Sequence, residues 1–373
     1  MTRDNVWRAA SLLFLGAILF AAVWALGPRV GNAEPREAET FETNDSHFHL
    51  TNYVQEGTNI HDFLTVMGTK VGRVALFGIP LQQQWSYGNT GRFAPTYYLQ
   101  SDAPLYYYSF TDAFIAMAYR SLSPHDQARF DPMITGFNPT DMYAADHVRR
   151  VLTTFPGVFS GIGEFTIHKE FVSAKVAGET ASLTNPALDR LLDFAGEVGL
   201  ISLIHSDIDA PFPKPGQDPY QAVQLGELIA RHPATTIIWA HLGLGRVVRP
   251  VKDQLAIIDR VLTNPSLSHL YLDISWDETA KYVVATPDTI AATANLINRH
   301  PDRFLFGTDE VAPSDQGTYL KVYRMYAPLF AQLKPSTSEL VRKGNYERLF
   351  DDARRRVRAW EKTNIIAGTQ AEP

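Results

Sequence analysis

The chain has 373 residues, a formal net charge of −6, 45% hydrophobic and 20% charged residues, and no cysteine. This composition is typical of a globular protein, and the length allows either two domains or one large α/β barrel. The absence of cysteine excludes disulfides, thiolate zinc sites, iron–sulfur clusters and a cysteine nucleophile. Any metal ion must therefore be held by His, Asp and Glu, and the acidic balance argues against nucleic acid as a partner.

The amino-terminal segment has the features of an export signal. Residues 9–26 form a long uncharged apolar run after a short stretch with two arginines, and small residues precede a plausible cleavage point after Ala33. The run is also about long enough to span a bilayer, so residues 1–33 are expected to be a signal peptide or an inner-membrane anchor. Both alternatives place the rest of the chain in the periplasm, with membrane contact only through this segment. Residues 34–44 are expected to be a polar linker.

From there onward one pattern repeats: a short apolar, β-branched run that ends in polar residues, followed by a longer stretch with helical periodicity. The short runs predict eight strands, at 46–50, 72–79, 132–137, 157–164, 200–205, 235–241, 269–275 and 303–309. The longer stretches predict helices, among them 186–198, 220–232, 251–262 and 287–299.

This alternation predicts a (β/α)8 TIM barrel over residues 45–350, and not an open doubly wound sheet, because eight strand–helix units close a barrel and no Gly-rich dinucleotide turn follows any strand. Residues 351–373 are expected to form a carboxy-terminal helix and tail. The first strand is the least typical, since residues 41–46 are polar for a buried strand.

An insertion rich in aromatic residues, 80–109, follows the second predicted strand and includes Tyr97, Tyr98 and Tyr106–Tyr108. Loops after barrel strands lie on the catalytic face, so this segment is expected over the mouth of the barrel. It fits two interpretations. One is a lid that lines a pocket for an apolar substrate body, and the other is a cover or an interface in a homo-oligomer.

Ionisable side chains terminate most of the predicted strands: His47, His49, Glu164, His205, His241 and Asp309. Imidazole and carboxylate are the donors that hold zinc, manganese or iron when thiolates are absent. The H-x-H spacing puts both imidazoles of the first strand on the same side. Each residue alone is as readily a buried structural group, but together they predict a divalent metal site, with zinc favoured, at the carboxyl ends of the strands.

The chain resembles the amidohydrolase superfamily, in particular its amidohydrolase-related branch of lactone hydrolases and decarboxylases of small carboxylates. The resemblance rests on the motifs D-S-H-F-H (45–49), G-I-G-E-F (161–165), L-I-H (203–205), W-A-H-L-G (239–243), F-G-T-D (306–309) and K-G-N-Y-E-R-L-F (343–350). Glu164 also resembles the strand-four glutamate that bridges two metals in TatD-type hydrolases. Many members of the amidohydrolase-related branch lack this glutamate and hold one metal, so the resemblance implies one or two ions.

With two ions, the histidines of the first strand and Asp309 would hold one, His205 and His241 the other, and Glu164 would bridge. With one ion, the histidines of the first strand, His205 and Asp309 would be the ligands, and His241 would polarise the substrate or move protons. In either arrangement Asp309 is the expected general base for a metal-activated water.

Four further residues after the strand ends are candidates for substrate binding: His168, Lys169, Arg246 and Trp276. Arg246 is the leading anchor for a substrate carboxylate or phosphate, with a surface ion pair as its alternative. Asp273, within the seventh predicted strand, is expected either to orient a ligand histidine by a hydrogen bond or to serve the barrel structurally.

The leading functional prediction is an exported metal-dependent hydrolase of a small ester, lactone or amide, with a carboxylate-bearing substrate as one form. The first alternative is a metal-dependent decarboxylase or hydratase of the same superfamily. A phosphodiesterase or nuclease is a weaker alternative, because it needs a basic surface. A non-enzymatic binding protein on this fold would hold no metal.

Overall fold

The computed structural model describes residues 40–52, 55–79, 91–92, 110–169, 181–210, 217 and 219–365. The predicted signal peptide or anchor, most of the linker, and the aromatic insertion apart from residues 91–92 lie outside these residues. No helix in the described part of the chain is long and apolar enough to cross a membrane.

The described strands form one nine-stranded sheet in which every neighbouring pair is parallel. The strands are β1 (Thr43–His49), β2 (Val71–Phe77), β3 (Phe130–Ile134), β4 (Gly161–His168), β5 (Ile201–Ser206), β6 (Ile237–Trp239), β7 (Leu270–Asp273), β8 (Phe304–Leu305) and β9 (Glu310–Val311). Strands β1 to β8 are neighbours in chain order, and β9 lies on the other side of β1.

The two edge strands, β8 and β9, are joined directly by residues 306–309, so the sheet curls until its edges meet. Two hydrogen bonds close this junction: Ser46 N donates to Phe306 O (3.0 Å), and Asp309 N donates to His47 O (2.7 Å). The α/β fold with a curled parallel sheet is consistent with the predicted TIM-type barrel.

The count of nine strands differs from the predicted eight, because residues 303–309 form two short strands. The backbone leaves the ladder between them, where Asp309 has a positive φ of 55°. A side chain at Gly307 would meet His47, since its Cβ would lie 2.7 Å from that of the histidine. Close packing against β1 therefore interrupts the last predicted strand at the position that carries the candidate ligand.

The first strand begins at Thr43, earlier than predicted, although its side chains are polar and every residue in it is buried. The polar groups have partners that the sequence does not reveal. Thr43 Oγ1 donates to Arg342 O (3.0 Å), Asn44 Nδ2 to Glu347 Oε1 (3.1 Å) and Ser46 Oγ to Phe306 O (3.0 Å). Because buried polar groups are tolerated when they are hydrogen-bonded, this strand can be both polar and central.

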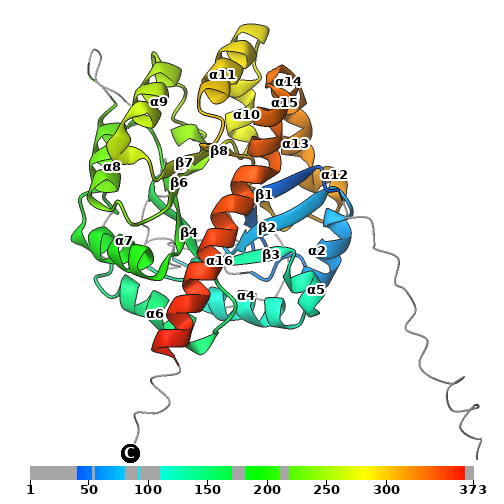
Figure 1. Ribbon diagram of the computed structural model, residues 1–373, viewed down its shortest axis with the longest axis vertical. Helices are drawn as coiled ribbons and strands as arrows, with labels where there is room; N and C mark the ends of the chain where they lie inside the picture. The colour runs from blue at the N-terminus through cyan, green and yellow to red at the C-terminus, as the bar shows by residue number, and fades with distance from the viewer. Residues whose placement is uncertain are drawn as a thin grey trace, which may run out of the picture. The chain divides into compact units, whose positions relative to one another are not determined.

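Helices surround the strands (Figure 1). They are α2 (Ile60–Met67), α4 (Thr111–Arg120), α5 (Pro124–Gln127), α6 (Ala144–Thr154), α7 (Pro186–Val198), α8 (Tyr220–Arg231), α9 (Gln254–Thr263), α10 (Asp277–Val283), α11 (Pro287–Arg299), α12 (Gln316–Tyr319), α13 (Lys321–Met325), α14 (Ala327–Gln332), α15 (Pro335–Glu339) and α16 (Asn345–Asn364). Helices α7 and α11 have their predicted bounds. Each starts with a proline after a capping side chain, Asn185 or Thr286, which accepts a hydrogen bond from the first turn.

The last helix, α16, crosses the sheet in Figure 1 and covers the amino-terminal ends of the strands. Its polar side chains bind carbonyl groups there: Asn345 Nδ2 donates to Phe304 O (2.8 Å), and Arg354 donates to Phe130 O. These carbonyls belong to the first residues of β8 and β3. With this end of the sheet closed by a helix, the carboxyl ends of the strands are left to carry the site.

Candidate metal centre

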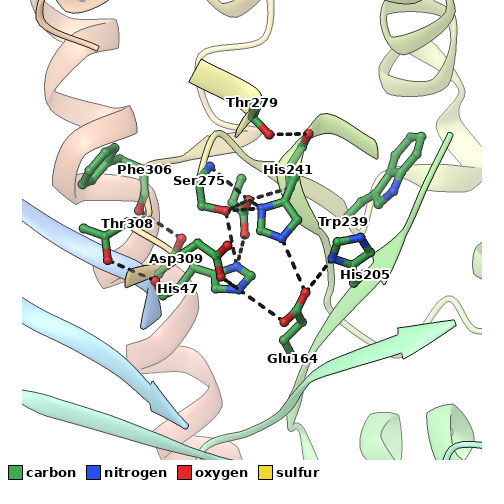
Figure 2. A network of polar contacts seen from close by, with 12 residues as sticks. His47, Glu164, His205, Trp239, His241, Ser275, Thr279, Phe306, Thr308 and Asp309 are labelled. Atoms are coloured by element: carbon green, nitrogen blue, oxygen red, sulfur yellow. Dashed lines mark hydrogen bonds and ion pairs between the residues drawn. The ribbon is translucent and has the colours of Figure 1, made fainter. Parts of the chain in front are cut away.

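The six side chains predicted as metal ligands lie together at the carboxyl ends of the strands. Figure 2 labels five of them, all but His49. Five of them are buried, and the side chain of Asp309 is 8% exposed. They lie at the end of β1 (His47 and His49), on β4 (Glu164), on β5 (His205), in the turn η3 (Ala240–Gly243) after β6 (His241), and in the connection between β8 and β9 (Asp309).

Glu164 lies between two pairs of histidines. Its Oε2 atom lies 3.7 Å from His47 Nε2 and 3.6 Å from His49 Nε2. Its Oε1 atom lies 2.7 Å from His205 Nδ1 and 3.4 Å from His241 Nε2. Each oxygen of one carboxylate therefore faces a different histidine pair.

Asp309 completes the side of the site formed by β1. Its Oδ1 atom lies 3.1 Å from His47 Nε2 and 3.0 Å from His49 Nε2. Three sets of described side chains have donor atoms within 4.8 Å of one another. One joins His47, His241 and Asp273, and the other two share Glu164. Of these two, the first set also contains both histidines of β1 and Asp309, and the second set contains His205 and His241.

Hydrogen bonds outside the cluster fix the protonation of the histidines on β1. His47 Nδ1 lies 2.9 Å from Asp273 Oδ2, and His49 Nδ1 lies 2.9 Å from Gly78 O. A carboxylate and a carbonyl only accept hydrogen bonds, so each Nδ1 carries the proton. In the neutral ring each Nε2 is then the nitrogen that can coordinate a cation, and it faces the carboxylates of Glu164 and Asp309.

The second pair is oriented in the same way. Ser275 Oγ donates to Asp273 Oδ1 and accepts a hydrogen bond from His241 Nδ1 (2.8 Å). His205 Nε2 lies 3.2 Å from Asp207 Oδ1, which accepts its proton. The nitrogens that face Glu164 are therefore His241 Nε2 and His205 Nδ1, and His205 Nδ1 donates a hydrogen bond to Glu164 Oε1 (2.7 Å) when no cation lies between them.

A divalent cation fits this arrangement. Nitrogens of four imidazoles face carboxylate oxygens, and two of these nitrogens, His47 Nε2 and His241 Nε2, are buried without a hydrogen-bond partner among the described residues. Unpaired buried polar atoms are costly, and metal-binding histidines typically donate their other N–H to a carboxylate or carbonyl. The donor set of nitrogen and oxygen atoms suits zinc, manganese or iron.

The backbone is strained where three site residues follow the strands. His241, Trp276 and Asp309 have φ angles of 58°, 74° and 55°, in the region that L-residues rarely adopt. Tertiary hydrogen bonds hold these turns, including His241 N to Asp273 Oδ1 (2.8 Å) and Trp276 N to Thr308 O (3.3 Å). Strain of this kind persists at sites where the surrounding structure determines it.

The charged groups of the site shift one another's pKa values. Burial raises the pKa of Glu164, but the Lys169 ammonium and the facing histidines outweigh it and hold that pKa well below its ordinary value. Burial also raises the pKa of Asp309, but His47 and His241 hold it well below the ordinary value. Burial lowers the pKa of His47, yet the nearby carboxylates, Asp309 first, raise it well above the usual range. Burial keeps the pKa of His241 low. Both carboxylates are thus ionised at neutral pH, as cation binding requires.

Three of the four predicted substrate-binding residues lie together beside the second histidine pair. The ring of Trp276 lies 5.0 Å from that of His241, between centroids. Lys169 Nζ and Arg246 Cζ lie 5.0 and 5.5 Å from the Trp276 ring centroid. The fourth residue, His168, ends β4, and its Nε2 atom is buried without a hydrogen-bond partner among the described residues. Its burial lowers its pKa, so its ring is neutral.

Asp45 has a role in the site that its sequence motif does not reveal. Its carboxylate accepts hydrogen bonds from Thr308 N (2.8 Å), Thr308 Oγ1 (2.7 Å), Tyr319 Oη (2.9 Å) and His47 N (3.0 Å). It therefore joins β1 to the residue that precedes Asp309. Period two along the strand puts Asp45 on the same side as His47 and His49, and this spacing is the signal that would have suggested its role. Ser275 gave no comparable signal.

Comparison with known proteins identifies the family. The family model described as amidohydrolase matches residues 45–351. The chain belongs to the amidohydrolase family. Membership makes it a metal-dependent enzyme of the amidohydrolase superfamily. A search of curated protein sequences finds no significant match to this amidohydrolase.

Solved structures of similar fold include a Pseudomonas putida protein proposed to be a 2-pyrone-4,6-dicarboxylic acid hydrolase. It is 14% identical to this amidohydrolase, with a TM-score of 0.50, and the match covers 84% of this chain and 98% of the other. Another is 2,6-dihydroxybenzoate decarboxylase in complex with 2,6-dihydroxybenzoate. It is 13% identical, with a TM-score of 0.50, and the match covers 84% of this chain and 100% of the other. At these identities the similarity concerns the fold.

Proposed function

We propose that this amidohydrolase is a two-metal hydrolase that attacks a small ester, lactone or amide with a metal-activated water. The position of Glu164 carries the proposal, because each of its oxygens faces a different pair of histidines. A carboxylate so placed can bridge two ions, as the strand-four glutamate of TatD-type hydrolases does. A single ion would leave one half of this donor set without a cation.

The six proposed ligands would be divided between two ions. The histidines of β1 and Asp309 would hold the first ion, and His205 and His241 the second, with Glu164 shared. Bound metal of this kind lowers the pKa of water and polarises a carbonyl group. Asp309 lies beside both histidines of β1 and has a pKa well below its ordinary value, so it is ionised and available to accept the proton of the attacking water.

Residues beside the second histidine pair supply a binding surface for an anionic substrate. The cationic groups of Lys169 and Arg246 both lie against the ring of Trp276, and Arg246 is exposed. A guanidinium can bind a carboxylate through two parallel hydrogen bonds. We therefore include a carboxylate-bearing ester, lactone or amide in the proposed substrate class.

The experiment combines metal quantification with activity assays on the full-length protein. The panel comprises esters, lactones, amides and phosphoesters, together with 2-pyrone-4,6-dicarboxylic acid and 2,6-dihydroxybenzoate, which the names of the two structural relatives suggest. We expect two equivalents of metal and hydrolysis of a carbon ester, lactone or amide. Release of CO₂ without hydrolysis would favour the decarboxylase alternative.

Two substitutions test the assigned roles. Glu164→Gln should lower the bound metal to one equivalent or less, and Asp309→Asn should abolish hydrolysis. The matched control is Asp351→Asn on α16, at the opposite end of the sheet, where the carboxylate pairs with Arg73. One equivalent in the unmodified protein, together with full activity of Glu164→Gln, would overturn the two-metal assignment. Full activity of Asp309→Asn would overturn its role as the base.

The cellular location of the enzyme is a separate proposal. The apolar run 9–26 after two arginines supports export to the periplasm, by a signal peptide cleaved after Ala33 or by an uncleaved inner-membrane anchor. Cell fractionation and amino-terminal sequencing of the mature protein distinguish the two. A cytoplasmic protein with an intact amino terminus would contradict both.

A further inference from the structure

Lys169 adds a positive charge to one side of the candidate metal centre. The residue follows β4, and its Nζ atom lies 3.9 Å from Glu164 Oε1. This is the oxygen that faces His205 and His241. The other oxygen, Oε2, faces the histidines of β1. The ammonium therefore lies on the side of the second proposed ion.

The ring of Trp276 and the carboxylate of Glu164 hold the Lys169 ammonium beside the second histidine pair. The Lys169 side chain is 22% exposed, and its Nζ atom lies 5.0 Å from the ring centroid of Trp276. Trp276 is itself only 7% exposed and is packed against His241 and His205, at centroid distances of 5.0 and 6.3 Å. A lysine held between an indole ring and a carboxylate is favoured by cation–π attraction as well as by charge pairing.

The two donor sets also differ in negative charge. The set on β1 contains two carboxylates, Asp309 and Glu164, and the second set contains Glu164 alone. The first set thus combines two negative charges with two imidazoles. The second set combines one shared negative charge with two imidazoles and the neighbouring Lys169 ammonium. Each set also has one further carboxylate behind a histidine, Asp273 at His47 and Asp207 at His205, so these two do not remove the difference. Like charges at short range in a partly buried site repel strongly.

We propose that Lys169 makes the two ion positions unequal, so that the position at His47, His49 and Asp309 fills first and the position at His205 and His241 fills only at higher metal concentration. The inference rests on the two-metal site proposed above. It makes the enzyme a one-ion protein when metal is scarce and a two-ion protein when metal is plentiful. Lys169 acts here as a positioning residue that sets ion affinity.

The experiment is a metal titration of the full-length protein after removal of bound metal with a chelator. Zn²⁺ and Mn²⁺ are used separately, and bound equivalents at each free concentration are measured by equilibrium dialysis and elemental analysis. We expect two separated steps for the unmodified protein. Lys169→Met should move the second step to at least ~10-fold lower free metal, because it removes a positive charge that lies 3.9 Å from the carboxylate oxygen facing the second histidine pair.

Two controls separate charge from other effects. Lys169→Arg keeps the charge and should keep both steps. Lys70→Met removes a lysine that pairs with Glu42 at the amino end of β2, and should also leave both steps unchanged. Lys169→Gln provides a second neutral variant, and circular dichroism of each variant verifies that it is folded.

The outcomes distinguish this inference from the proposed function. Two steps that coincide in the unmodified protein and in both neutral variants would overturn the role of Lys169 and leave the two-metal site intact. A second step that moves as far in Lys169→Arg as in Lys169→Met would also overturn it. A single equivalent in every variant would overturn both. One equivalent in the unmodified protein and two in Lys169→Met would support the inference.

Discussion

Replacement of Asp273 by asparagine is expected to weaken metal binding, although it changes none of the six proposed metal ligands. The Asp273 carboxylate is fully buried, and both of its oxygens accept hydrogen bonds. Oδ2 accepts from His47 Nδ1 (2.9 Å), and Oδ1 accepts from His241 N (2.8 Å) and from Ser275. Asparagine has the same shape but only one accepting oxygen. Its NH₂ group cannot face His241 N or Ser275 N, because those groups are donors. The NH₂ group must therefore face His47.

The consequence for His47 is a reversed tautomer. An NH₂ group at Nδ1 requires that nitrogen to accept, which moves the imidazole proton to Nε2, the atom that faces Glu164 and Asp309. His47 Nε2 then has no lone pair for a metal ion. Restoring that lone pair returns the proton to Nδ1, where it faces the NH₂ group of the asparagine, which is also a donor. Substitutions of this kind typically weaken metal affinity ~10–100-fold. At about 1.36 kcal/mol per factor of ten, the loss is about 1.4–2.7 kcal/mol.

The assay is competition for Zn²⁺ against a chromophoric chelator, with unfolding in urea measured on the same metal-free samples. Asp131→Asn is the control. Asp131 is an equally buried aspartate at the other end of the sheet, where it binds Arg73 and Tyr346. We expect the control to lose stability and keep its zinc affinity. Zinc affinity of Asp273→Asn within twofold of the unmodified protein, or an equal loss in the control, would refute the reasoning.

Three other predictions follow. Burial raises the pKa of Asp45 to about 6, so its contribution to the free energy of unfolding is greatest below about pH 4 and is lost as pH rises through 6. The stability of Asp45→Asn relative to the unmodified protein should therefore rise by about 3 kcal/mol between pH 4 and pH 7 in urea titrations of metal-free protein; a pH-independent difference would contradict this. Arg246→Met should raise KM for a carboxylate-bearing substrate on the order of tenfold and leave KM for a neutral one unchanged, since it removes a charged hydrogen-bond donor; equal effects on both substrates would argue for a structural role. Chelation should lower Tm and added Zn²⁺ should restore it, because a ligand at about 100 times its Kd adds ~2.7 kcal/mol to the free energy of unfolding; a Tm independent of metal would count against a bound ion.

The elements that the sequence predicted well are those whose boundaries are local. Helices α7 and α11 start at a capping residue followed by proline, and their apolar periodicity continues to the last residue. Caps and periodicity involve residues within a few positions of one another, so the chain alone specifies them. The observed strands likewise overlap the predicted ranges, although several begin or end at other residues than predicted.

The errors in the strands have tertiary causes. The predicted strand 235–241 is observed only as Ile237–Trp239, because the backbone turns at His241, where a hydrogen bond from His241 N to Asp273 Oδ1 holds a positive φ. The predicted strand 303–309 breaks where Gly307 packs against His47. β1 starts early because distant residues satisfy its polar side chains. None of these partners is near in sequence, so local sequence patterns do not predict these contacts.

For the site, the sequence by itself determined the chemical types of the donors and the end of the sheet on which they gather. Without cysteine, only His, Asp and Glu were available, and parallel strands bring their carboxyl ends to one edge. The tertiary structure decided the rest. His47 and Asp273 are 226 residues apart in the chain, and their contact sets which imidazole nitrogen faces the centre. The direction of each Glu164 oxygen and the place of the Lys169 ammonium depend on packing between strands, which residue type and spacing do not encode.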